Sequence, residues 1–81
     1  METNKKLKEI FIDLFHINES TELSEINIGK IESWDSLNHL SLIISIESRF
    51  GVDIPPDDFP SLHSDFNSIR DYIDEKLNNK N

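Results

Sequence analysis

The segment between Asp35 and Gly51 constrains the fold most, because it carries helix start and stop signals around an apolar run. Asp suits hydrogen bonds from the free N–H groups of a first helical turn, and Gly is typical of the residue that ends a helix. We predict a helix from about Ser36 to Phe50. At about 100° per residue, an arc of roughly 220° is apolar: Leu37, Leu40, Leu42, Ile43, Ile44, Ile46 and Phe50. So wide an arc predicts a central helix that other helices cover from two sides.

Apolar residues at helical spacing predict two further long helices. The first is expected over residues 5–15, with apolar positions at i, i+3, i+4, i+7 and i+8: Leu7, Ile10, Phe11, Leu14 and Phe15. The second is expected from Ser64 or Asp65, and its apolar residues are Phe66, Ile69, Ile73 and Leu77, with Tyr72 beside them. The prolines of VDIPPDDFPSL limit the chain between Pro56 and Leu62 to a turn or two of helix.

A long loop is predicted between the first two helices, over HINESTELSEINIGKIESW. Its isoleucines alternate with polar residues, but Gly29 and the short length argue against a lasting strand. We expect an ordered loop that is pinned to the core by Ile26, Ile28 and Ile31. The predicted fold class is therefore all-α. It is a four-helix bundle of three main helices plus one short helix, in a single domain over residues 1–81 whose tail frays from about residue 78.

Composition and charge narrow the classes of partner. Sixteen acids against eight Lys and Arg give a net charge of −8, which repels phosphate backbones, so no nucleic acid partner is expected. The same self-repulsion predicts that added salt stabilises the fold. No apolar run approaches the roughly 20 residues that a membrane span needs. With no cysteine and no signal-peptide pattern after METNKKLKEI, we predict a cytoplasmic protein.

Ser36 stands alone at the start of the predicted helix, and its hydroxyl fits three roles. In the first, Asp35 and Ser36 only start a helix, where both residue types are common. In the second, His39 at i+3 activates Ser36 as a nucleophile, although such a pair also needs an orienting acid, an oxyanion hole and a pocket. In the third, a phosphodiester on the hydroxyl lies beside the helix N-terminus, where free N–H groups and the helix dipole favour an anion.

Metal and nucleotide sites are not predicted. The three histidines are too scattered for a metal-ligand spacing, and no cysteine assists them. The acids between Gly51 and Phe59 lack the alternation and the glycine of a calcium loop. The chain has two glycines and no phosphate-cradling glycine loop.

The stretch WDSLNHLSLIISIESRFGVDIP resembles the acyl carrier protein family. The residues that carry the resemblance are Asp35-Ser36-Leu37, Glu47, Phe50 and Ile54-Pro55. The resemblance extends over most of the chain, because that family also has a long first helix, a long loop before the serine and a short third helix. Its last helix contains Tyr-Ile, here Tyr72-Ile73. In that family, the serine carries a 4′-phosphopantetheine arm whose terminal thiol holds an acyl group as a thioester.

The resemblance implies a covalent carrier rather than an enzyme, with Ser36 as the residue that takes 4′-phosphopantetheine from coenzyme A. Asp35 and Leu37 are then the neighbours that a phosphopantetheinyl transferase recognises. Further implied partners are an acyl-loading ligase or acyltransferase and an acyl-consuming enzyme, which a monomer is expected to visit in turn. The implied docking face consists of Asn38, Ser41, Ile44, Glu47 and Ser48. The alternatives are an aminoacyl or peptidyl carrier and an unmodified small helical interaction domain.

The chain departs from the family on the exposed face of this helix. Carriers of general fatty acid synthesis display several acids there, which basic patches on partner enzymes read. Here the corresponding positions are neutral: Asn38, Ser41, Ser45 and Ser48. A basic partner gains little electrostatic steering from such a face. We therefore expect a stand-alone carrier of specialised type that serves a dedicated pathway.

Three further expectations concern the surroundings of the serine. Trp34, where the family often has a small residue, is expected to form an aromatic lid over the loop and the core, with a contact to a partner protein as the alternative. His39 is expected to be a surface histidine, with contact to the phosphate of the arm as the alternative. The third is a core crevice that shelters part of an acyl chain and is lined by Leu40, Ile44, Ile46 and Ile54. Core packing alone also accounts for these residues.

Overall fold

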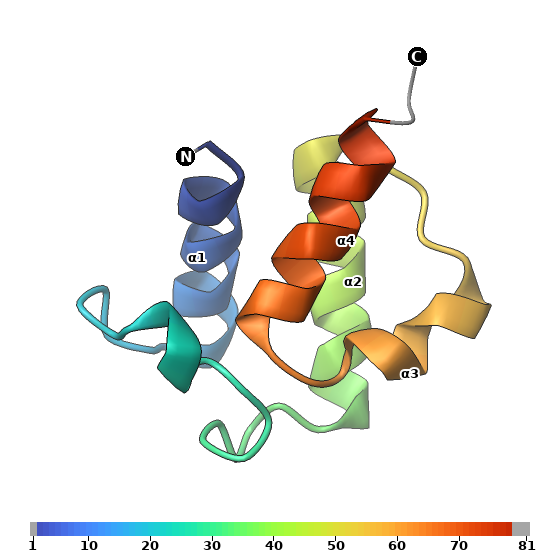
Figure 1. Ribbon diagram of the computed structural model, residues 1–81. Helices are drawn as coiled ribbons and strands as arrows, with labels where there is room; N and C mark the ends of the chain where they lie inside the picture. Colours follow the sequence, from blue (N-terminus) through green and yellow to red (C-terminus); the bar gives the residue numbers. More distant parts are fainter. Residues whose placement is uncertain (1, 79–81) are drawn as a thin grey trace.

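Three long helices form the body of the protein, for which the computed structural model describes residues 2–78. They are α1 (Glu2–Phe15), α2 (Ser36–Phe50) and α4 (Phe66–Asn78). The shorter elements are the 3-10 turns η1 (Leu23–Glu25) and η2 (Pro56–Asp58) and the single-turn helix α3 (Phe59–Leu62). Because α1 packs against both α2 and α4 (Figure 1), the predicted all-α bundle of three main helices and one short helix is confirmed.

Two findings concern the extent of these helices. None of those within residues 2–78 has the length and apolar character needed to cross a membrane. The predicted fraying of residues 79–81 lies outside the described residues, and Asn78 is the last residue of α4.

α2 begins and ends where the sequence signals predict. Asp35 precedes it with an extended backbone (φ −91°, ψ −178°), and its Oδ1 accepts a hydrogen bond of 2.9 Å from the Asn38 N–H. Gly51 follows it in the left-handed conformation (φ 65°), and its N–H donates to the Glu47 carbonyl oxygen over 2.9 Å. Local bonds thus close both ends, and they place Ser36 as the first helical residue.

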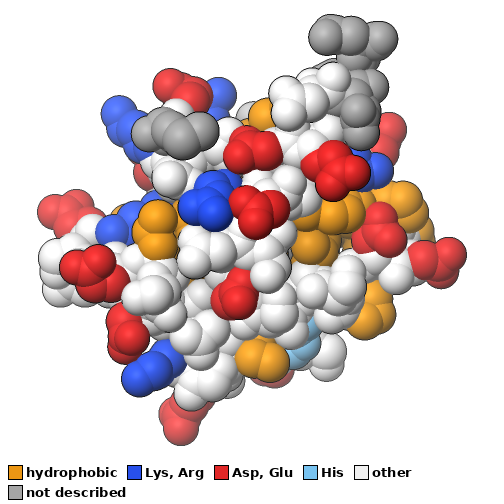
Figure 2. Space-filling model, in the orientation of Figure 1, with side chains coloured by type: hydrophobic (Ala, Val, Ile, Leu, Met, Phe, Trp, Pro, Cys, Tyr) orange, Lys and Arg blue, Asp and Glu red, His pale blue; other side chains and the backbone are white. Residues whose placement is uncertain are grey.

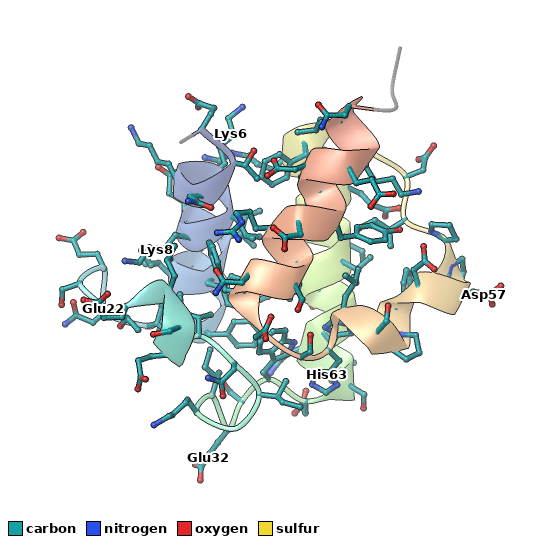
Figure 3. All side chains as sticks on the ribbon, in the orientation of Figure 1. Lys6, Lys8, Glu22, Glu32, Asp57 and His63 are labelled. Atoms are coloured by element: carbon teal, nitrogen blue, oxygen red, sulfur yellow. The ribbon has the colours of Figure 1, made fainter. Side chains whose placement is uncertain are left out.

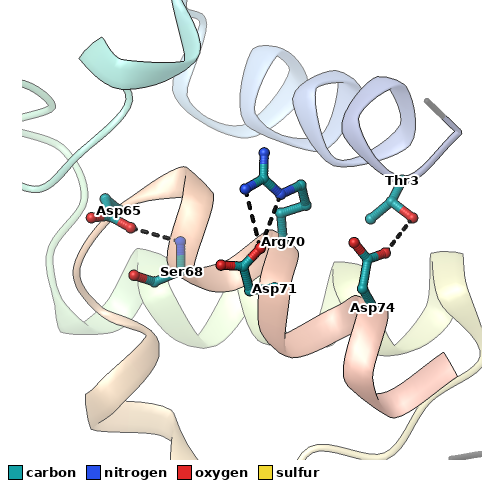
Figure 4. A network of polar contacts seen from close by, with 6 residues as sticks. All are labelled: Thr3, Asp65, Ser68, Arg70, Asp71 and Asp74. Carbon is teal, nitrogen blue, oxygen red and sulfur yellow. Dashed lines mark hydrogen bonds and ion pairs between the residues drawn. The ribbon is translucent and has the colours of Figure 1, made fainter. Parts of the chain in front are cut away.

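Polar contacts join α1 to α4 and cap the N-terminal end of α4 (Figure 4). Thr3 Oγ1 donates to Asp74 Oδ1 over 2.8 Å. This contact orders the first turn of α1, which therefore begins before the predicted residue 5, where apolar spacing gave no signal. Asp65 Oδ1 accepts a hydrogen bond of 2.7 Å from the Ser68 N–H, and α4 begins at Phe66, one residue after the predicted Asp65.

Two of the three loop isoleucines reach the core. Ile26 and Ile31 are buried, as predicted, but Ile28 is 47% exposed, so the prediction is wrong for this residue. The Asn27 carbonyl oxygen accepts hydrogen bonds of 3.0 Å from the N–H groups of Lys30 and Ile31. These bonds turn the chain and leave Ile28 on the solvent side of the turn.

The apolar arc of α2 is covered on one side only, so the predicted cover from two sides is wrong. Its buried apolar residues include Leu42, Ile43 and Ile46. Its exposed ones are Leu37 (75%), Leu40 (46%) and Ile44 (64%), which we call the outer face of α2. The single turn of α3 lies beside the N-terminal end of α2 (Figure 1), where Phe59 contacts His39 on the buried side of the helix, so α3 does not cover this face.

This arrangement also corrects the predicted crevice for an acyl chain. Ile46 and Ile54 lie in the core, where they are 0% and 4% exposed. Leu40 and Ile44 belong to the outer face instead, because their positions on α2 point away from the core. The four side chains therefore line no common internal space, and the prediction is wrong for Leu40 and Ile44.

Candidate functional site

Ser36 is the first residue of α2, and its side chain is exposed. Within residues 2–78 no hydrogen bond engages its hydroxyl. The N–H groups of Ser36 and Leu37 belong to the first helical turn, which has no intrahelical acceptor for them. These N–H groups and the helix dipole favour negative charge beside the serine. The site thus combines a free hydroxyl with surroundings that suit a phosphodiester.

The backbone on both sides of Ser36 is held by short hydrogen bonds. Asp35 caps the helix through the Asn38 N–H, and its carbonyl oxygen accepts a bond of 2.8 Å from the His39 N–H. The Asn38 side chain in turn donates from Nδ2 to the Ser33 carbonyl oxygen over 2.7 Å. The serine is therefore fixed in position while its hydroxyl remains free.

Trp34 closes the loop over the core, as predicted. Its side chain is buried, and its ring lies edge-on to Phe11 with ring centroids 5.2 Å apart. The ring of Phe15 lies 5.7 Å from it on the same side of the bundle. This packing anchors the chain two residues before Ser36 to α1.

His39 is buried (5% exposed), so the expectations of a surface histidine and of a phosphate contact are both wrong. Its Nδ1 accepts a hydrogen bond of 2.9 Å from the Trp34 indole N–H, and its Nε2 lies 2.7 Å from the Phe59 carbonyl oxygen. Burial lowers the pKa of the imidazole below its usual value; the bond to Phe59 opposes this effect, and the electrostatic interaction with His63 adds to it. Because both ring nitrogens have partners, an imidazole is tolerated at this depth.

The same bonds exclude the alternative in which His39 activates Ser36 as a nucleophile. A general base must offer a free ring nitrogen to the serine hydroxyl, and both nitrogens of His39 are bonded to Trp34 and Phe59. In the part of the chain from residue 2 to residue 78, no group of three or more His, Cys, Asp or Glu side chains is placed to hold a metal ion.

His63 is the residue of this site that the sequence did not identify. Its Nε2 donates to the Trp34 carbonyl oxygen over 2.6 Å, and its ring stacks on that of His39 with centroids 4.7 Å apart and an interplanar angle of 23°. Figure 3 shows His63 in the chain segment that follows α3, near the start of α2. It lies 29 positions from Trp34 along the chain, so no local periodicity indicates this contact.

The predicted docking residues differ in how freely they face solvent. Ile44 and Ser48 are exposed, and Ser41 is half-buried. The Glu47 carboxylate accepts a hydrogen bond of 2.9 Å from the Ile54 N–H, which holds the loop after α2. Glu47 therefore has a structural partner inside the chain, and a docking role for these residues stays a prediction.

Charge is distributed unevenly between α2 and α4. Glu47 is the one acid among the fifteen residues of α2, whereas α4 exposes Asp71 and Glu75. Figure 2 shows acidic side chains spread over the face of the molecule that α4 presents. The outer face of α2 is therefore apolar and carries little charge within an acidic protein.

A groove of about 550 Å³ between α1 and α2 is a second feature that the sequence did not indicate. It is lined by Ile10, Asp13, Leu14, Ile44, Ser45, Ser48 and Arg49. Ile44 and Ser48 thus lie next to side chains of α1 as well as next to solvent. The groove depends on how the two helices pack, which their separate periodicities do not specify.

Among the comparisons with known proteins, the one with curated proteins gives a match. No family model matches the chain, and no solved structure gives a significant match. Among curated proteins, the chain matches the acyl carrier protein of Thermosynechococcus vestitus with 28% identity over 73 residues. The match covers 90% of this chain and 89% of that protein. Similarity over nearly the whole of both chains, together with the all-α bundle, supports a carrier-protein role.

Proposed function

We propose that this protein is an acyl carrier in which Ser36 is covalently attached to 4′-phosphopantetheine. The observation that carries the proposal is the free, exposed hydroxyl of Ser36 on a firmly held first turn of α2. Attachment leaves a phosphodiester on Ser36 Oγ, close to the first-turn N–H groups, which suit an anion. When bound, the arm supplies a thiol that holds an acyl group as a thioester.

The chain itself presents and orients the arm, and does not catalyse its chemistry. Asp35 and Asn38 hold the turn that carries Ser36, so the attachment point keeps one orientation towards every partner. Leu37, 75% exposed, offers the phosphopantetheinyl transferase an apolar contact next to the reacting hydroxyl. The remaining oxygen of the Asp35 carboxylate is a second contact for that enzyme.

We infer that the loading and consuming enzymes dock on the outer face of α2. Leu37, Leu40 and Ile44 follow one another along the helix at a spacing that places them on one side. Exposed apolar side chains that adjoin one another mark protein interaction surfaces. A partner with an apolar, weakly charged patch fits this face better than a strongly basic one, which favours dedicated enzymes of one pathway.

Intact-mass spectrometry tests the proposed attachment. The protein is incubated with coenzyme A and a broad-specificity phosphopantetheinyl transferase, beside a known carrier that reports the activity of the transferase. The wild type is expected to gain one phosphopantetheine, Ser36→Ala none, and the matched control Ser33→Ala the same as the wild type. No gain in the wild type while the known carrier is modified would favour the unmodified interaction domain.

The cargo is tested on the modified protein. Adenylating enzymes for fatty acids and for amino acids are offered in parallel, and the thioester is detected by its mass and its release by hydroxylamine. We expect loading with an acyl group. Loading with an amino acid alone would assign the chain to the aminoacyl or peptidyl carriers.

A further inference from the structure

The two hydrogen bonds of His39 specify one protonation state of its ring. The Trp34 indole nitrogen is only a donor, so Nδ1 of His39, 2.9 Å away, must accept with a free lone pair. The Phe59 carbonyl oxygen is only an acceptor, so Nε2, 2.7 Å away, must carry a proton. His39 is therefore neutral and protonated at Nε2. A second proton, on Nδ1, would set two N–H donors against each other at hydrogen-bond distance.

These bonds join three parts of the chain around Ser36. Trp34 belongs to the loop two residues before the serine, His39 lies one turn after it on α2, and Phe59 begins α3. The His63 ring donates to the Trp34 carbonyl oxygen and stacks on the His39 ring, so it closes the cluster from the C-terminal end of α3. The segment that carries Ser36 is thus connected to α3 through one imidazole.

We propose that His39 is a positioning residue: its neutral ring clamps the Ser36 segment to α3, and protonation of the ring releases this clamp. Among residues 2–78, the ionisable side chain that faces the ring is that of His63, after α3. The loop faces the ring with the Trp34 indole, and α3 faces it with a carbonyl oxygen, neither of which titrates. α1 reaches the cluster through Phe11 and Phe15, which pack on Trp34.

The environment of the ring sets the direction of the response. Burial lowers the pKa of His39, so the clamp is closed at neutral pH and opens at a pH below the usual pKa of a histidine. Protonation removes the acceptor for Trp34 and adds a positive charge in stacking contact with His63. Both changes act on the contact between the loop and α3, which spans the start of α2.

NMR spectroscopy of the unmodified protein tests the clamp. Long-range proton–nitrogen spectra are expected to show His39 with a free Nδ1 and a protonated Nε2 at neutral pH. The protein has one tryptophan, so its indole N–H signal reports the bond from Trp34 without ambiguity. On acidification, this signal and the amide signals of α3 should shift together with the His39 ring. A proton on Nδ1 at neutral pH, or a His39 titration that moves neither reporter, would overturn the proposal.

Two substitutions separate the halves of the clamp. His39→Asn places an amide oxygen near the position of Nδ1 and keeps an acceptor for Trp34, whereas His39→Gln places an amide N–H near Nε2 and keeps a donor for Phe59. Neither titrates, so both variants should lose the acid-induced indole shift. In His39→Asn the α3 amides should resemble the released state at all pH values, with the indole bond retained, and His39→Gln should show the reverse.

His63→Gln is the matched control, because an amide N–H near Nε2 keeps the donor to the Trp34 carbonyl oxygen. It should retain the transition linked to His39. Loss of the transition in this variant, with the fold intact by circular dichroism, would assign the switch to His63 and overturn the role of His39. The wild-type titration tests the proposal even if one His39 variant fails to fold.

The consequence for Ser36 rests on the proposed function. Rates of phosphopantetheine transfer are compared for the wild type and His39→Asn across pH, as a ratio, so that the pH dependence of the transferase cancels. The wild type should be faster at neutral pH, and the ratio should approach one in acid. A ratio that does not change with pH would overturn the positioning role in transfer. No transfer to either protein would overturn the proposed function, whereas the spectra test the clamp independently.

Discussion

The two sides of α2 differ in a way that the polarity of their side chains does not predict: a polar ring is buried on one side, and large apolar side chains are exposed on the other. On the inner side, the imidazole of His39 is 5% exposed and lies against Trp34 and α3. On the outer side, Leu37 is 75% and Ile44 64% exposed, although both are large and apolar. On the inner side, the hydrogen bonds of His39 hold the start of the helix in place. The outer side adds little to the core and leaves a surface for other molecules.

The difference shows that burial follows from what lies opposite a residue. A polar ring is stable inside when every ring nitrogen has a partner, as His39 has with Trp34 and Phe59. An apolar side chain stays outside when no element within residues 2–78 packs over it, as on the outer face of α2. The inner side of α2 thus holds the proposed attachment residue in position, and the outer side is open for the proposed docking.

The largest contrast is expected between two neighbouring isoleucines. Ile43 is 1% exposed and Ile44 is 64% exposed, so Ile43→Ala should lower the free energy of unfolding by about 2–5 kcal/mol. Ile44→Ala should change it by no more than about 0.5 kcal/mol. Urea unfolding followed by circular dichroism measures both values. Similar losses in the two variants would show that the outer face is covered in solution.

Replacement of the buried imidazole should have the next largest effect. His39→Leu keeps a side chain of similar size but removes the partners of the Trp34 indole N–H and the Phe59 carbonyl oxygen. A buried donor without a partner costs about 1–3 kcal/mol, so urea unfolding should show a loss in this range. A stability equal to that of the wild type would mean that the two bonds contribute nothing to the inner side.

The pH dependence of stability should distinguish the wild type from His39→Gln. The folded-state pKa of His39 is lowered, so between about pH 6.5 and that lowered pKa only the unfolded chain binds the proton. The wild type should therefore lose stability as the pH falls through this range, and the variant should lack this component. Unfolding is measured at a series of pH values for both proteins. A constant difference between the two curves would contradict the lowered pKa.

The smallest effect expected is that of salt on the whole molecule. With a net charge of −8, the folded chain repels itself, and screening should raise the free energy of unfolding from low to moderate ionic strength. Thermal melts of the wild type and of Glu75→Gln measure this rise. The variant has one charge fewer on the acidic face of α4 and should show a smaller rise. A stability that falls with salt would show that ion pairs outweigh the repulsion.

Short-range sequence patterns predicted the features of the fold that depend on neighbouring residues. Asp35 and Gly51 define the ends of α2 because their hydrogen bonds go to groups within four positions, so the place of Ser36 was visible in the sequence. The buried positions of α1 and α4 followed from their periodicity in the same way.

Contacts between distant segments account for what the sequence did not predict. The burial of His39 depends on Phe59, 20 positions away, and the role of His63 depends on Trp34. The exposure of Leu40 and Ile44 depends on which side of α2 the other helices pack, which helical spacing within α2 does not specify. Ile28 faces solvent because a turn at Asn27 overrides the alternation around it.

The most direct test of the proposed carrier is the location of the modification within one peptide. Cleavage after Lys30 and Arg49 releases residues 31–49, which contain five serines: Ser33, Ser36, Ser41, Ser45 and Ser48. The protein is first incubated with coenzyme A and an active phosphopantetheinyl transferase, and the peptide is then fragmented by tandem mass spectrometry. We predict phosphopantetheine on Ser36 and on no other serine. An unmodified peptide, or a modification on one of the other four serines, would contradict a carrier built on the first turn of α2.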